Sequence, residues 1–186
     1  MTKIPTFHTP RLTLRELVES DAPAYEKYFV DYEVIRTLHA VVPWPYPSGG
    51  VLEFIRTKLL PHQGNNKWVW AITLKENPSE LIGVVDLWRP GRPENRGFWL
   101  GHKFWGRGYM TEAVRPVIDY AFSDLGFEKL VFTNAVGNRR SGRVKVKTGA
   151  TLVSREAASF VDPTLTEREV YELTKDAWNK FKASEG

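Results

Sequence analysis

The chain has 186 residues, 42% apolar and 13% aromatic, which is enough to bury a full hydrophobic core in a single domain, 1–186. Cysteine is absent, which excludes disulfides, a cysteine nucleophile and thiolate metal sites. The net charge of +4 arises from 26 basic and 22 acidic residues spread along the chain, a modest imbalance that does not favour nucleic acid as a partner.

The sequence has no stretch of about 20 apolar residues that could span a membrane, and its N-terminus lacks the apolar run of a secretion signal. We therefore expect a cytoplasmic protein that does not bind membranes. The four histidines are scattered, and without cysteine they do not form a zinc-binding pattern, so we expect no metal.

β-rich patterns alternate with helical patterns along the chain. The expected strands are 12–15, 68–74, 81–87, 97–102, 129–135, 151–156 and 168–173. Turn residues predict a hairpin at Glu76-Asn77-Pro78-Ser79 and a second turn at 89–93.

The helices are predicted from apolar residues at helical spacing and from residues that favour helix ends. The expected helices are 20–30, 33–39, 48–59, 109–125, 139–148 and 175–181. Ser20 or Asp21 can cap the first, Ser48 the third, and Gly126 is placed to end the fourth. In the fifth, Gly142 is a poor helix former, and Lys145 stands where an apolar residue is usual.

The most informative segment is 97–113, where a strand runs through a glycine-rich turn into a helix. The first turn of a helix has unpaired N–H groups and the positive end of the helix dipole, and glycine lets a phosphate approach the backbone closely. The segment therefore indicates a pyrophosphate-binding loop. From the spacing of the glycines alone, an ordinary turn between strand and helix is an equal alternative.

Residues 105–110, Trp-Gly-Arg-Gly-Tyr-Met, followed by Thr-Glu-Ala, resemble the [Gln/Arg]-x-x-Gly-x-[Gly/Ala] cofactor signature of the GNAT N-acetyltransferases. Trp105 in place of Gln/Arg is typical of the RimJ/RimL-like group, which acetylates ribosomal-protein N-termini, whereas Met110 replaces a Gly or Ala. Segments 9–15, 42–47 and 138–150 also resemble that group, in the same order. The resemblance implies an α+β (mixed α/β) fold whose central, mostly antiparallel mixed sheet has splayed strands and helices on both faces.

The resemblance also implies that acetyl-coenzyme A wedges between strands 97–102 and 129–135. The backbone near Trp99 and Leu100 would then pair with the pantetheine arm. The residues expected to bind the cosubstrate are Trp99, Leu100, Trp105, Gly106, Arg107, Gly108, Tyr109, Met110, Thr111, Asn138 and Ser141.

Acyl transfer from a thioester to an amine requires removal of a proton from the amine, stabilisation of an oxyanion and protonation of the leaving thiolate. A strand N–H near Leu100 is the natural oxyanion donor. Ser141, which matches the family's serine, is the expected proton donor, and Asn138 would order the pantetheine arm. Alternatively, Ser141 only caps or packs at the start of its helix, and Asn138 is a turn residue.

The group often carries a glutamate just before the equivalent of Gly97, but this chain has Glu94-Asn95-Arg96 there, so the acid is either shifted or absent. Candidates for the general base are Glu94 and Asp86, the latter at the end of the preceding strand. Either could instead be an ordinary surface carboxylate. His39, His62 and a water-relayed base are further possibilities.

The acceptor groove is expected to involve Trp44, Tyr46 and Trp88, the first two presented by a proline-stiffened turn. Most tryptophans in a chain with seven belong to the core, which is the alternative for each of them. Glu112 is assigned to capping its own helix, where carboxylates are favoured.

These expectations describe an N-acetyltransferase that transfers the acetyl group directly to the α-amine of a protein or peptide. An α-amino group, with a pKa of about 7.7–8, loses its proton far more readily than lysine at about 10.4. The alternatives are a small-molecule N-acetyltransferase acting on a polyamine or an aminoglycoside, and a non-catalytic module that binds coenzyme A or protein. The enzyme is expected to be a monomer or a homodimer.

Overall fold

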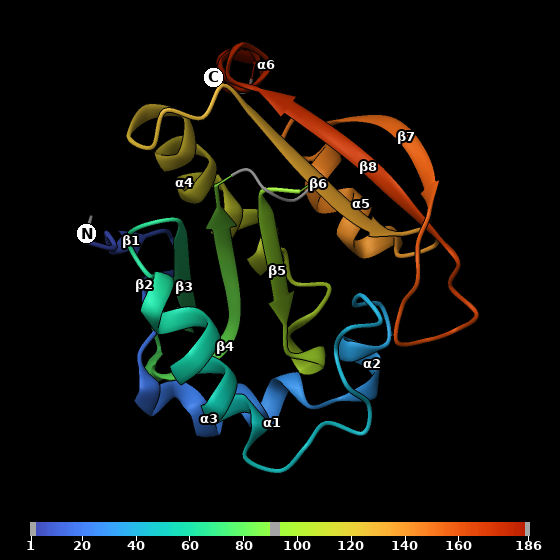
Figure 1. Ribbon diagram of the computed structural model, residues 1–186. Helices are drawn as coiled ribbons and strands as arrows, with labels where there is room; N and C mark the ends of the chain where they lie inside the picture. The colour runs from blue at the N-terminus through green and yellow to red at the C-terminus, as the bar shows by residue number, and fades with distance from the viewer. Residues whose placement is uncertain (1–2, 90–93, 185–186) are drawn as a thin grey trace.

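The computed structural model describes residues 3–89 and 94–184, and within them the strands form two antiparallel sheets (Figure 1). The larger sheet has the order β1 (Phe7–His8), β2 (Leu12–Glu16), β3 (Lys67–Leu74), β4 (Asn77–Trp88), β5 (Arg96–Leu100). The smaller sheet has the order β6 (Lys129–Ala135), β8 (Glu167–Thr174), β7 (Thr151–Ala157). Every hydrogen-bonded strand pair in these two sheets is antiparallel.

The helices lie around both sheets. They are α1 (Ala22–Phe29), α2 (Tyr32–Ile35), α3 (Gly50–Phe54), α4 (Tyr109–Ser123), α5 (Arg139–Val146) and α6 (Lys175–Ser184). α1 and α4 contact the larger sheet, whereas α5 and α6 contact the smaller one. Trp99 of β5 contacts the Tyr25 and Phe29 rings of α1, with centroids 4.7 and 5.2 Å apart, whereas Trp70 of β3 contacts Tyr120 of α4. Trp99 and Trp70 pair with the adjacent residues 84 and 85 of β4, so they point to opposite faces. α1 and α4 therefore cover opposite faces of the larger sheet.

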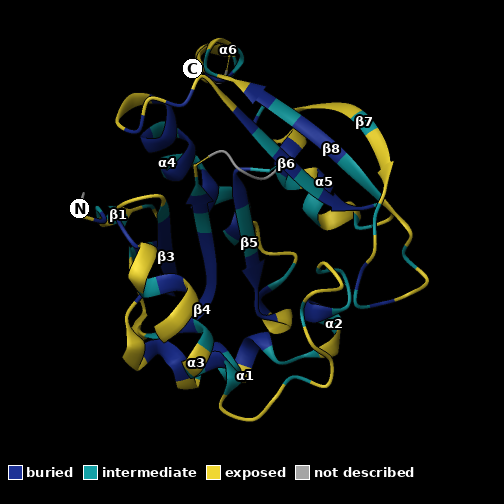
Figure 2. Ribbon diagram, in the orientation of Figure 1, coloured by how far each residue is buried: buried dark blue, intermediate teal, exposed yellow. Residues whose placement is uncertain are grey.

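The hydrophobic core fills the space between the sheets and these helices; Figure 2 shows β3, β4 and β5 mostly buried and β7 mostly exposed. The largest fully buried side chains of the core include Trp68, Trp70, Phe132 and Trp178. The indole N–H of Trp178 in α6 donates to Asp119 of α4 at 2.8 Å, which ties the C-terminal helix to the rest of the core.

The two sheets meet at one point and then diverge. The Asn95 N–H donates to the Val131 carbonyl at 2.9 Å, and the Val131 N–H donates to Asn95 Oδ1 at 3.1 Å. Beyond this contact β5 and β6 separate toward their C-terminal ends (Figure 1), as the splayed strands of the predicted fold require. Each is the edge strand of its own sheet, so their facing backbone edges have no strand partner.

Several predicted boundaries are corrected by the structure. Leu74 pairs with Asn77, so the hairpin turns at residues 75 and 76, and β4 begins where the turn was expected. The helix expected over 33–39 ends at Ile35 because residues 38–40 form backbone hydrogen bonds with residues 159–161 instead. Most of the turn expected at 89–93 lies outside the described residues.

The helix expected over 48–59 begins at Gly50 and continues as a π-helical turn over 55–59. Its N-cap residue is Gly49 in a left-handed conformation, φ 71°, rather than Ser48. Among the described residues, no helix combines the length and apolar character required to cross a membrane.

Candidate active site

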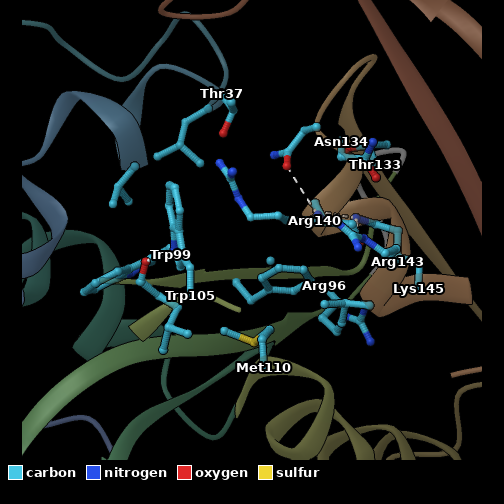
Figure 3. Close-up of a pocket in the computed structure, with 18 of the residues that line it drawn as sticks. Thr37, Arg96, Trp99, Trp105, Met110, Thr133, Asn134, Arg140, Arg143 and Lys145 are labelled. Carbon is cyan, nitrogen blue, oxygen red and sulfur yellow. Dashed lines mark hydrogen bonds between the residues drawn. The ribbon is translucent and has the colours of Figure 1, made fainter. Parts of the chain in front are cut away.

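A cavity of about 460 Å³ occupies the gap between β5 and β6 (Figure 3). Its walls come from both strands, from the loop before α4, from α5, and from residues 34–39 and 158–160. The predicted site residues that line it are Trp88, Glu94, Trp99, Leu100, Trp105, Gly106, Gly108, Tyr109, Met110, Thr111, Asn138 and Ser141. The sequence therefore located both walls of one cavity.

The pairing of β5 with β4 determines which backbone groups of β5 face this cavity. The Gly101 N–H donates to the Ile82 carbonyl across that ladder at 2.9 Å. Because backbone groups alternate in direction along an antiparallel strand, Trp99 also bonds toward β4, whereas Phe98 and Leu100 present their N–H and C=O groups to the gap. Of the two residues expected to pair with an extended ligand, Leu100 faces the gap, whereas Trp99 faces β4 and Phe98 takes its place.

The loop before α4 leaves room for a phosphate. Gly106 and Gly108 have φ angles of 76° and 78°, in the left-handed region that favours glycine, and a Cβ at Gly106 would meet no atom within 4 Å. The first helical hydrogen bond runs from the Glu112 N–H to the Gly108 carbonyl, so the amides of residues 109–111 precede it and lack an intrahelical acceptor. An open glycine loop followed by free helical amides fits a pyrophosphate.

Trp105, which replaces the family's Gln or Arg, closes this loop onto β5. Its indole N–H donates to the Leu100 carbonyl at 2.7 Å, and its ring contacts His102 with centroids 4.4 Å apart. The Arg140 guanidinium of α5 lies 3.9 Å from the centre of the same ring, which connects the two walls at the wide end of the gap. Because its carbonyl accepts from Trp105, Leu100 presents only its backbone N–H to the cavity.

Glu112 was expected to cap its own helix, but in the structure it does not. Its carboxylate accepts hydrogen bonds from the Thr9 hydroxyl at 2.6 Å, the Arg11 N–H at 2.8 Å and the Arg11 guanidinium at 2.7 Å. These bonds lower the pKa of Glu112 against the opposing effect of burial. Arg11 also donates to the Arg107 carbonyl at 2.8 Å, so the segment before β2 holds the glycine loop from outside. Arg107 itself does not line the cavity.

The opposite wall is the start of α5. Asn138 is the N-cap residue, and its Oδ1 accepts from the Ser141 N–H at 3.3 Å. The Lys145 ammonium, one helical turn later, donates to Ser141 Oγ at 2.7 Å. Ser141 thus lines the cavity with its hydroxyl already held by a cation.

Lys145 is almost fully buried, at 2% exposure, whereas the arginines of the same helix are exposed. Burial lowers its pKa well below the ordinary value, the nearby Arg96 lowers it further, and Glu169 partly offsets both. Arg96 at the start of β5 is also buried, and burial lowers its pKa to about 9. Sequence reasoning missed this pair of buried cations; the only signal was a charge at a position where the family pattern is apolar.

Other basic side chains surround the wide end of the gap. Arg140, Arg143 and Lys147 line the main cavity, and Arg36, Arg139, Arg140 and Arg143 line a neighbouring one of about 380 Å³. The resulting positive charge lies next to the glycine loop, where it suits the phosphates of a nucleotide.

The two carboxylates considered as general base occupy different surroundings. Glu94 lines the cavity, and its Oε2 is buried and makes no hydrogen bond to a described residue; the nearest cation is the Arg168 guanidinium at 3.9 Å. Asp86 lies outside the cavity lining and pairs with Lys67 at 3.2 Å. His39 lines the cavity and His62 does not.

Two of the three aromatic residues expected in the acceptor groove lie elsewhere. Trp44 is 43% exposed and packs on Tyr32, and Tyr46 packs edge-on against Phe29 of α1. Neither lines the cavity, whereas Trp88 does. The proline-rich turn therefore covers α1 and α2 rather than the gap. Among residues 3–89 and 94–184, no cluster of three or more His, Asp or Glu side chains could hold a metal ion.

Comparison with known proteins identifies the class. Residues 11–151 match the acetyltransferase (GNAT) domain family. An uncharacterized N-acetyltransferase, p20 of Bacillus licheniformis, is 31% identical over 130 residues, covering 67% of this chain and 70% of its own. FsC-acetyl coenzyme A-N(2)-transacetylase of Aspergillus fumigatus is 27% identical over 96% of this chain and 80% of its own.

Among solved structures, the ribosomal L7/L12 alpha-N-protein acetyltransferase RimL, in complex with coenzyme A, superposes with a TM-score of 0.75. It is 21% identical, and the match covers 94% of this chain and 98% of that one, so it shows the fold. The fold and the site together define an acyltransferase. This chain belongs to the GNAT acetyltransferase family, whose members transfer an acetyl group from acetyl-coenzyme A.

Proposed function

We propose that this enzyme acetylates the α-amine of a protein or peptide N-terminus within a ternary complex. One observation carries the proposal: Glu94 and Ser141, a carboxylate and a hydroxyl from opposite walls, line the same cavity between β5 and β6. A base and an acid on either side of one space are what direct aminolysis of a thioester requires. The chain's similarity to the RimJ/RimL-like group favours a protein N-terminus as the acceptor.

The cosubstrate would lie along the gap between the sheets. Its pyrophosphate would contact the amides of residues 109–111 and the open loop at Gly106, with Arg140 and Arg143 nearby. Its pantetheine amides would pair with the outward-facing Leu100 N–H and Phe98 C=O, because the Leu100 carbonyl already accepts from Trp105. The acyl end then points away from the glycine loop, toward the contact of Asn95 with Val131.

Glu94 is the proposed base. Its buried Oε2 accepts no hydrogen bond from a described residue and has the Arg168 guanidinium only at 3.9 Å, so it can accept a proton from the attacking ammonium; the Asp86 carboxylate is paired more closely, with Lys67 at 3.2 Å. At pH 7 a deprotonated α-amine is roughly 400 times more abundant than a deprotonated lysine side chain, from reference pKa values of about 7.8 and 10.4. A single carboxylate therefore suffices for an N-terminal acceptor.

Ser141 is the proposed acid. Lys145 Nζ donates to Ser141 Oγ, so the hydroxyl hydrogen stays free for the leaving sulfur. The outward-facing N–H of Phe98, which lies nearer the acyl end than Leu100, is the proposed donor to the oxyanion. As the C–S bond breaks, the Ser141 proton passes to sulfur and is replaced through Lys145.

The test is thiol release from acetyl-coenzyme A with a peptide that has a free N-terminus and internal lysines. The matched control peptide is blocked at its N-terminus. We expect turnover on the free peptide alone, and a drop in kcat of about 10²–10⁴-fold in Ser141→Ala and Glu94→Gln. Asp86→Asn is the control for Glu94→Gln and should keep most of the activity.

Equal turnover on the blocked peptide would contradict the N-terminal acceptor, and an active Glu94→Gln variant would contradict the proposed base. If acetyl-coenzyme A binds but no amine is acetylated, the protein is a non-catalytic module that binds coenzyme A.

A small amine is the second candidate acceptor. It is favoured by the FsC-acetyl coenzyme A-N(2)-transacetylase, whose similarity extends over 96% of this chain. Polyamines and aminoglycosides belong in the same panel, and faster turnover on one of these than on any peptide would establish this alternative.

A further inference from the structure

The narrow end of the gap contains two buried cations, Arg96 and Lys145, and no described residue forms a salt bridge with either of them. Every side-chain nitrogen of Arg96 is buried, and none makes a hydrogen bond to a described residue. Arg96 and Lys145 both line the cavity, and both lie near the Phe98 ring, with Arg96 Cζ 5.5 Å and Lys145 Nζ 5.2 Å from its centre. Like charges buried this close raise the energy of the protein unless an anion joins them.

The nearest carboxylate does not neutralise the pair. Glu169 already accepts hydrogen bonds from Asn134, from the Tyr171 hydroxyl and from Arg155, each at 3.0 Å. Aromatic rings compensate only part of the Arg96 charge: the guanidinium lies 3.8 Å from the centre of the Phe132 ring. The cluster therefore keeps a positive surplus directed at the cavity.

The position along the strand identifies what could reach this cluster. Arg96 precedes Phe98 by two residues on the same edge of β5, a distance of about 6–7 Å. It lies next to the Asn95–Val131 contact, at the opposite end of the gap from the glycine loop. On the proposed function, only the acyl group or the acceptor reaches that end, because the phosphates remain at the glycine loop.

We propose that Arg96 and Lys145 bind a carboxylate of a substrate at the narrow end of the gap. The inference rests on the proposed function. The carboxylate belongs either to the acyl group of the coenzyme A thioester or to the acceptor next to its reacting amine. In both cases it pairs with Arg96, whose guanidinium makes no hydrogen bond to a described residue, and lies near Lys145, which donates to Ser141; the carboxylate takes no part in the reaction itself.

The experiment has a donor arm and an acceptor arm. The donor arm compares succinyl-coenzyme A with butyryl-coenzyme A, which has the same chain length without the charge, by calorimetric Kd and by kcat/KM. The acceptor arm uses acetyl-coenzyme A and compares peptides that begin with Asp or Glu against those that begin with Asn or Gln. We expect at least a tenfold preference for the carboxylate in one arm, as charge-assisted hydrogen bonds provide.

Variants assign the preference to the cluster. Arg96→Met should reduce the ratio of charged to neutral substrate at least tenfold, and Arg96→Lys should retain part of it. The matched control is Arg89→Met: Arg89 also lies over two rings, 5.3 Å from Trp68 and 5.0 Å from Phe127, but outside the cavity lining. This control should leave the ratio unchanged.

A wild-type enzyme that transfers acetyl groups but shows no carboxylate preference in either arm would overturn this inference alone. A preference that survives in Arg96→Met would overturn it as well. Failure of both coenzyme A and acetyl-coenzyme A to bind would instead overturn the proposed function, and this inference with it.

Discussion

Replacing Lys145 with methionine should stabilise the protein while slowing the reaction. The side chain is 2% exposed and lies among the rings of Phe98 and Tyr171, where an unbranched apolar chain of similar length fits. Exchanging a buried charge for an apolar group typically gains about 1–4 kcal/mol, and the lost hydrogen bond to Ser141 costs about 1 kcal/mol. We expect a net gain of up to about 3 kcal/mol, which at its upper limit raises Tm by roughly 6–12 °C in a chain of this size.

The pH dependence of stability gives this prediction a second readout. The pKa of Lys145 is lowered in the folded protein, so between that pKa and the ordinary value of 10.5 the unfolded chain binds more protons. Wild-type stability must therefore rise with pH across this window, by about 1.4 kcal/mol for each unit of pKa shift. Below the folded pKa both states carry the proton, and the contribution to the slope vanishes. The methionine variant lacks this slope, although Arg96, Glu169 and Tyr171 still titrate nearby.

The assay is thermal unfolding of both proteins from pH 6 to pH 10, with kcat measured on the same samples. A less stable Lys145→Met protein, or one with the same rise in stability as the wild type, would refute the account of Lys145 as a buried, destabilising cation. A variant that is more stable and equally active would refute its role in holding Ser141. Stabilisation and loss of activity together are the expected result.

Two further changes test the cosubstrate wall. Gly106→Ala should lower the free energy of unfolding by about 1–2 kcal/mol because its φ is 76°, and it should weaken coenzyme A binding. The control Gly126→Ala, at φ 69° and equally uncrowded, should lower stability by the same amount without changing the Kd for coenzyme A. Thermal unfolding measures the stabilities, and calorimetry measures the Kd. Trp105→Phe removes the hydrogen bond to the Leu100 carbonyl, so it should lower the free energy of unfolding by about 1 kcal/mol and raise the KM for acetyl-coenzyme A. An unchanged KM in steady-state kinetics would contradict the role of Trp105 in closing the loop.

The sequence predicted the secondary structure well where local patterns decide it. The strand at 129–135 has the observed bounds, and the helix from Tyr109 starts at the predicted residue, because glycines and apolar spacing define those segments. The helix expected to extend to residue 39 ends early because its backbone bonds to residues more than 100 positions away. Tertiary pairing of this kind has no local signature.

The same contrast between local and long-range signals applies to the site. Motif positions such as Gly106 and Ser141 line the cavity, since the family pattern encodes them directly. The partners that hold them were not predicted: Glu112 contacts Arg11 across the fold, and Lys145 is buried against Ser141. Charge alone suggests a solvated surface for Lys145, and only the packing of α5 on the smaller sheet shows otherwise.

The gap between β5 and β6 also has a consequence for solubility. Two edge strands with free backbone groups face one another there, and such edges are sites at which sheets of different molecules can join. A pantetheine arm between them would satisfy those groups as an additional strand does. Ligand at 100 times its Kd adds about 2.7 kcal/mol to the free energy of unfolding. The enzyme is therefore expected to be purified and stored best with coenzyme A present, and its resistance to aggregation should follow the supply of its own cosubstrate.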